Sequence, residues 1–204
     1  MHLTKNLCVN LLGFLSTYGY AKDTLEARRD LKEMKQREVL RPEKREKGQH
    51  YLRPASYTLS EEEKVSLFDC LNNMKALSGY SSNMQGKINM KEKKFTNLKS
   101  HDCHVLMTQL LPVTLRGILP ENVRLAIVKL CAFHNEISQK AIDPNKLTKL
   151  QNDVVQCLVS FEMVFPPSFF NIMTHLLVHI VKEINILALY SYTICSLSRG
   201  TWQS

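Results

Sequence analysis

Prolines divide the second half of the chain into apolar segments with helical periodicity. They stand at positions 112, 120, 144, 166 and 167. Between them, apolar residues recur at intervals of three and four, the pattern of an α-helix with one buried face. Proline breaks or kinks the interior of a helix but suits its first turn. The pattern therefore predicts several helices joined by short connections and packed as a bundle.

Polar residues that suit helix starts precede these segments. Ser60 followed three residues later by Glu63 has the form of a capping box, in which each residue's side chain accepts a hydrogen bond from the other's backbone N–H. Ser100, Asp143 and Ser168 each stand just before an apolar run and are predicted to cap the next helix. The last of these helices is expected to begin at about residue 169.

These patterns predict an all-α chain, with the bundle in the C-terminal half preceded by one to three helices and flexible charged linkers. The 7 glycines, 7 prolines and 8% aromatic residues are few for a β-sheet protein rich in turns. The predicted segments are residues 1–40, a linker over 41–94 with one helix at about 60–77, a helical domain over 95–187, and a tail over 188–204.

The net charge of +8 comes from two polar segments outside the apolar helices. Residues 22–53 hold 11 basic and 7 acidic residues, and residues 87–99 hold 5 lysines and one glutamate. Basic segments attract nucleic acids without sequence preference, so DNA contact through these segments is one interpretation. The alternative is that they are solvated linkers.

The six cysteines are widely spaced and form no CxxC motif. Four of them lie in apolar helical contexts, where a free cysteine behaves as a small hydrophobic residue. Reduced thiols in an intracellular compartment are therefore expected. The N-terminus lacks the ordered features of a signal peptide. The uncharged run at 184–197 is shorter than the roughly 20 residues of a membrane span, so no membrane association is predicted.

Histidines cluster in two stretches, one of which also holds a cysteine, and suggest a zinc site. One stretch carries His101, Cys103 and His104, and the other carries His175 and His179, which share one helix face four residues apart. Zinc accepts imidazole and thiolate ligands in a tetrahedron, so these five residues are candidate metal ligands. The residue after the first histidine of the second stretch is not glutamate, which excludes the HExxH motif of zinc proteases. The alternative is a set of histidines packed at helix interfaces.

Three segments resemble one known family. They are MHLTKNLCVNLLGFL at 1–15, KFTNLKSHDCHVLMTQLLPVTLRGILPENVR at 94–124, and IDPNKLTKLQNDVVQCLVSFEMVFPPSFFNIMTHLLVHIVKEI at 142–184. All three resemble plant CACTA-type (En/Spm-like) transposon proteins. The region at 95–187 is similar to domain of unknown function 4218, which follows the transposase domain in those proteins. Residues 1–40 would then be a remnant of the end of the transposase region.

The resemblance implies a non-catalytic accessory role. The family's nuclease part has an RNase H-like fold with acidic metal ligands, nearly all of which would precede Met1. Relatives carry glutamate where this chain has Thr4, and residues 188–204 do not align with them. The implied work is assembly or nucleic-acid contact in transposition, with the transposase protein as a partner and a nuclear location. Two alternatives stay open: a metal-binding enzyme or structural zinc module, and a degenerate fragment with no selected activity.

Overall fold

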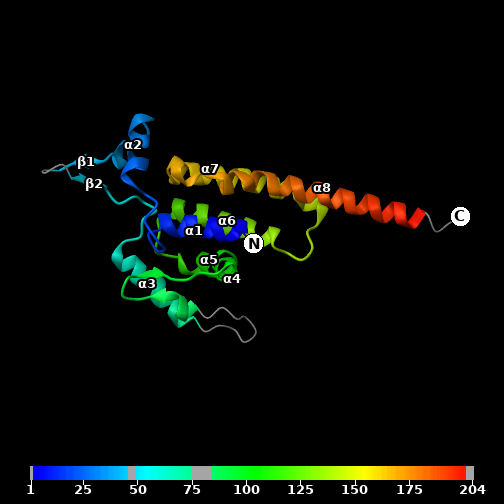
Figure 1. Ribbon diagram of the computed structural model, residues 1–204, viewed down its shortest axis with the longest axis horizontal. Coiled ribbons are helices and arrows are strands. Elements are labelled where there is room, and N and C mark those ends of the chain that lie inside the picture. Colours follow the sequence, from blue (N-terminus) through cyan, green and yellow to red (C-terminus); the bar gives the residue numbers. More distant parts are fainter. Residues whose placement is uncertain (1, 46–48, 75–83, 201–204) are drawn as a thin grey trace.

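The computed structural model describes residues 2–45, 49–74 and 84–200, with side chains described up to residue 187 except at 85. This structure is mostly helical, which confirms the predicted fold class (Figure 1). The α-helices are α1 (His2–Phe14), α2 (Leu25–Glu33), α3 (Glu61–Asn73), α4 (Ser100–Val105), α5 (Leu111–Thr114), α6 (Glu121–Ile137), α7 (Leu147–Val164) and α8 (Ile172–Gly200). Shorter turns are η1 (Glu38–Leu40), η3 (Met84–Lys87), η5 (Pro144–Lys146) and η6 (Pro167–Phe169), and η4 (Leu106–Leu110) is π-helical.

Two short antiparallel strand pairs were not predicted. β1 (Glu43–Lys44) pairs with β2 (His50–Tyr51), and β3 (Ile88–Asn89) pairs with β4 (Lys94–Phe95). The first pair forms an arm that extends away from the helices beside α2 (Figure 1). Both pairs are too short to give an alternating pattern, so sequence periodicity could not reveal them.

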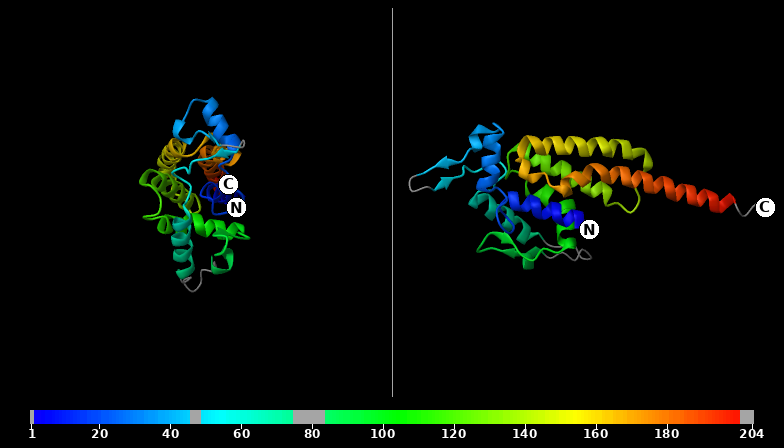
Figure 2. Two further views of the ribbon diagram at one scale, coloured as in Figure 1. Left: turned by 90° about the vertical axis from the view of Figure 1, so that its left-hand side faces the viewer. Right: turned by 45° about the horizontal axis from the view of Figure 1, so that its top comes forward.

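The helices pack side by side around α1. α6 packs along α7, α7 packs along α8, and α1 contacts both α4 and α8. Two views show α8 running beside α7 and then extending beyond the other helices (Figures 1 and 2). The expected bundle therefore forms, but its interior includes a helix from the very start of the chain.

One hydrophobic core contains side chains from several segments that were predicted to be separate. Residues 1–40 contribute the apolar face of α1, and the segment predicted to be a linker contributes side chains before and within α3. These interior side chains are largely those of Leu7, Leu11, Leu12, Phe14, Leu15, Tyr57, Leu59, Leu67, Phe68 and Leu71, all at most 2% exposed. Residues 41–94 are thus in part a structural component of the core.

Two predicted helix starts are confirmed. The Ser60 hydroxyl accepts from the backbone N–H of Glu63 at 3.2 Å, and the Glu63 carboxylate accepts from that of Ser60 at 2.7 Å. Asp143 accepts from the backbone N–H of Asn145 at 3.0 Å, with Pro144 in the first turn of η5, which leads into α7. In both cases a short side chain satisfies an N–H that has no partner inside the helix.

Two other predicted caps are wrong. The N-cap of α4 is Lys99, so Ser100 already lies inside the helix. The carboxylate of Asp102 accepts from the backbone N–H of Lys99 at 2.8 Å. α8 begins at Ile172 instead of about 169. The side-chain oxygen of Asn171 accepts from the backbone N–H groups of Met173 and Thr174. Ser168 instead lies within η6. The intervening turn buries Phe169, which delays the helix start.

The predicted disruption near Pro112 takes the form of a π-helical turn. η4 links α4 to α5, and Pro112 lies in the first turn of α5. A π-turn accommodates a residue that does not fit the regular α-helical hydrogen-bond pattern. The hydroxyl of Thr108 donates to the carbonyl of His104 at 2.8 Å, and that of Thr114 donates to the carbonyl of Leu110 at 3.0 Å. The helical path therefore continues through Pro112, and two of its carbonyls accept hydrogen bonds from side-chain hydroxyls.

Candidate functional site

The FPPSFF motif is a structural anchor for the start of α8. Phe165 and Phe169 are each 1% exposed, with ring centroids 4.7 Å apart. They pack against Phe161 of α7, Phe14 of α1 and Tyr57, with centroid separations of 4.9–5.9 Å. Aromatic pairs of this kind dominate core energetics through the large area that each ring buries. The motif thus joins three distant parts of the chain.

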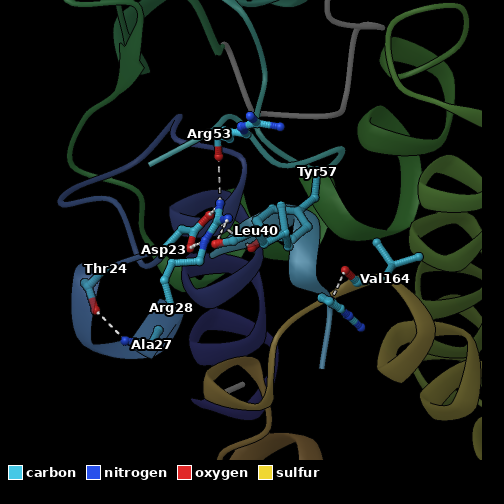
Figure 3. A network of polar contacts seen from close by, with 9 residues as sticks. Asp23, Thr24, Ala27, Arg28, Leu40, Arg53, Tyr57 and Val164 are labelled. Carbon is cyan, nitrogen blue, oxygen red and sulfur yellow. Dashed lines mark hydrogen bonds and ion pairs between the residues drawn. The ribbon is translucent and has the colours of Figure 1, made fainter. Parts of the chain in front are cut away.

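A buried ion pair organises the N-terminal segment (Figure 3). Arg28 is 1% exposed and makes two contacts of 2.5 Å with the carboxylate of Asp23. It also donates to the carbonyls of Leu40 and Arg53 at 3.0 Å, and the Tyr57 hydroxyl donates to Asp23 at 3.0 Å. Burial opposes the charge of Arg28, but hydrogen bonding and attraction to Asp23 raise its pKa overall. Because its groups satisfy one another, the network is structural.

A second arginine connects this segment to α7. Arg37 donates to the carbonyl of Val164 at 2.5 Å and also to that of Glu162. These carbonyls belong to the last turn of α7, where no further helical N–H is available to them. The side chain of Arg37 therefore supplies the missing donors. The contact ties the N-terminal region to the same helix that packs on α8.

The first histidine and cysteine stretch directs only its cysteine fully into the protein interior. Cys103 is fully buried against α1, where the thiol of Cys8 hydrogen-bonds to it. That hydrogen bond and burial raise the pKa of Cys8 well above its ordinary value. His104 is half-buried and His101 is exposed. The same hydrogen bond lowers the pKa of Cys103, but its thiol is fully buried where α4 packs on α1 and is not accessible to solvent.

The second stretch presents its histidines to the solvent. His175 and His179 are both exposed on α8, and their Nε2 atoms lie 3.0 Å apart. Their ring centroids are 4.7 Å apart. The predicted spacing on one helix face is therefore realised as direct contact between the two rings. Two imidazole nitrogens that face each other at this distance are well placed to share a proton or a metal ion.

The five predicted ligands do not converge. Among the residues that the structure describes, no group of three or more histidine, cysteine or acidic side chains is arranged to hold a metal ion. The structure joins His175 to His179 and pairs Cys103 with a different residue, Cys8. Zinc binding by this set stays a prediction.

His134 is a buried polar residue that was not among the predicted site residues. Its side chain is 1% exposed, and neither ring nitrogen has a hydrogen-bond partner. Burial and the nearby His104 lower its pKa from 6.5 to about 4. In the sequence His134 follows Leu130 by four positions and Ile127 by seven, which is the spacing of one helix face and the signal for its burial. It is a neutral core residue at ordinary pH.

An apolar surface lies between α7 and α8. We define the α7–α8 face by its exposed apolar residues, which are Val155, Val159, Met163, Phe170, Ile172 and Leu176. Met163 is 77% exposed and Ile172 is 62% exposed. An open hollow of about 720 Å³ lies in this face, lined by Val155, Leu158, Val159, Glu162, Phe170, Asn171, Ile172, Thr174, His175 and Val178. Contiguous apolar surface of this kind usually marks a site of protein association.

Part of the chain matches a known family. Residues 137–193 match the family described as Domain of unknown function (DUF4218). The match begins after the predicted domain boundary at residue 95. It extends past residue 187 into the segment predicted to be a tail. It includes α7, the first part of α8, and hence the α7–α8 face with His175 and His179. No curated protein and no solved structure matches the chain.

Within the described residues, the helices lack a stretch of the length and apolar character that a bilayer crossing requires.

Proposed function

We propose that this chain is a non-catalytic helical accessory module of a transposon-derived protein, and that it works by self-assembly through the α7–α8 face. The observation that carries the proposal is the exposure of Val159, Met163 and Ile172 on two adjacent helices. Burying such side chains releases about 1.5–3 kcal/mol each when the burial is complete. The match to DUF4218 covers this same pair of helices, which supports a role for them in the module.

Part of the positive charge in the basic segments is used inside the fold. Lys93 pairs with Glu61 at 3.0 Å, and Lys87 lies 3.7 Å from Asp102. Arg28 is used in the buried network described above. Side chains engaged in internal contacts are less available to neutralise phosphate groups. The positive charge that suggested DNA binding is therefore used in part to hold the fold together.

The partner that we propose for the α7–α8 face is a second copy of the chain. α7 and α8 form an adjacent pair, and a twofold axis converts such a pair into a four-helix arrangement. Exposed charges around the face are mixed, with Glu162 and Glu183 negative and Lys182 positive. Their mixed signs limit repulsion between identical faces.

The family resemblance supports the remaining parts of the proposal. Thr4 lies half-buried on α1, where relatives carry glutamate, and a threonine hydroxyl does not bind a divalent cation as a carboxylate does. We therefore assign no nuclease chemistry to this segment. A nuclear location and association with the transposase protein follow from the same resemblance.

Sedimentation velocity over a concentration series, with and without zinc, tests self-assembly. Val159→Asp should raise the dimer dissociation constant at least about tenfold, because it places a charge where an apolar side chain is buried. Val113→Asp is the matched control, since Val113 is 50% exposed on α5 and Val159 is 53% exposed. A wild-type chain that stays monomeric in both conditions would overturn the proposal, as would equal effects of the two substitutions.

A further inference from the structure

We propose that His175 and His179 form half of a tetrahedral zinc site, and that the same pair from a second copy of the chain forms the other half. This inference rests on the proposed function, because it requires the α7–α8 faces of two copies to meet. It identifies what the exposed histidine pair does within that face.

The geometry of the pair fits a shared metal ion. Two nitrogens bound to one zinc ion at about 2.0–2.1 Å in a tetrahedron lie about 3.3 Å apart. The Nε2 atoms of His175 and His179 are 3.0 Å apart, so only a small ring rotation separates the observed arrangement from a bound one. Both residues belong to one α-helix, four positions apart, so the backbone already fixes their separation.

The pair needs two further ligands. Structural zinc is bound by four protein groups, and the described part of the chain brings no third histidine, cysteine or carboxylate into a ligand group. A twofold axis through the ion would present the same two imidazoles from the opposite side. In such an isologous contact each residue of one copy is used again in the other, so one exposed pair completes a four-histidine site.

The surroundings of the pair favour closure by a protein surface. Ile172 and Leu176 lie three positions before and one position after His175, and both are exposed. A second copy that supplies ligands would cover these apolar side chains in the same step. Glu162 lines the same hollow as His175, so one carboxylate from each copy would offset part of the charge of the ion.

Zinc titration of the full chain tests the inference. Protein stripped with a chelator is titrated with zinc chloride, while mass is followed by light scattering and zinc content by elemental analysis. We expect the mass to double at one zinc ion per two chains. Cobalt substituted for zinc should give the intense visible absorption of a tetrahedral site. A double variant carrying His175→Gln and His179→Gln should lose the mass doubling, with its fold checked by circular dichroism.

The matched control carries His101→Gln and His104→Gln, which remove two histidines from the other stretch. This control should keep the zinc response. The inference is overturned if zinc leaves the mass unchanged, if zinc binds at one ion per chain without dimerisation, or if the response survives in the His175 and His179 variant. Self-association that needs Val159 but not zinc would overturn this inference and leave the proposed function standing. Zinc-driven dimers that are unaffected by Val159→Asp would overturn the proposed function, and with it the α7–α8 contact on which this inference rests.

Discussion

The two histidine-bearing stretches look alike in sequence but differ in which candidate metal ligands they bury. In Ser100–Arg124, Cys103 is fully buried because α1 covers it. In Phe165–Lys182, Phe165 and Phe169 are buried, whereas His175 and His179 face the solvent because no described element covers that side of α8. The difference teaches that the role of such a motif depends on which distant helix packs over it. Four predictions probe this contrast, from the largest expected effect to the smallest.

Removing α1 should have the largest effect. A chain without residues 1–15 loses Leu7, Leu11 and Leu12, each fully buried, together with the cover of Cys103. Each leucine contributes about 1.5–3 kcal/mol, and domains are stable by only about 5–15 kcal/mol in total. We expect thermal unfolding followed by circular dichroism to lose its cooperative transition. The substitution His2→Ala, at an exposed position of the same helix, is the control and should leave the transition in place. Cooperative unfolding of the truncated chain would contradict the central place of α1.

Phe165→Ala should destabilise the folded chain by removing a buried ring of the second stretch. The ring stacks on Phe161 and Tyr57 and is 1% exposed, so its removal leaves a cavity. We expect a loss of about 3–5 kcal/mol in the free energy of unfolding, measured with urea. Val39→Ala is the control, because Val39 is 72% exposed and lies outside the α7–α8 face, so its loss should change stability little. Similar losses from both substitutions would count against the aromatic anchor.

His134 is the interior counterpart of the exposed histidine pair and should make stability depend on pH. Its pKa is about 4 in the folded chain against an ordinary 6.5, so the unfolded chain binds a proton first as pH falls. The stability that neutral His134 contributes is complete above pH 6.5 and is lost progressively towards pH 4, by up to about 3 kcal/mol. His134→Leu should remove this component and should raise stability at pH 7 as well, because it removes two unpaired buried nitrogens. Parallel pH profiles for the wild type and this variant would refute the assignment.

His175→Gln and His179→Gln should have the smallest effect on the fold. Both side chains are exposed, and surface substitutions usually change stability by no more than about 0.5 kcal/mol. Urea unfolding of the zinc-free single variants should therefore match that of the wild type. A loss well beyond that range would show that the pair supports the fold, which would make the two stretches more alike than the structure indicates.

Local features of the fold were predictable from the sequence, and long-range packing was not. The capping residues Ser60 and Asp143 act on N–H groups two or three positions away, so nearby residues suffice to identify them. The start of α8 was misplaced because burial of Phe169 depends on α1, far away in the sequence. The contact of His175 with His179 followed from helical spacing alone. The separation of Cys103 from that pair depended on tertiary structure, which periodicity does not encode.

The position of α1 also has a consequence for the order in which the chain folds. The side chain of Asn10 donates to the carbonyl of Phe169 at 3.0 Å. A residue of α1 therefore contacts a residue that is synthesised 159 positions later. At a synthesis rate of about 5–20 residues per second, the apolar face of α1 waits roughly 8–30 s for η6 to be synthesised. During that time the leucines of α1 lack their final partners and are exposed to aggregation or to chaperones. The native core therefore forms only after residue 169 has been synthesised.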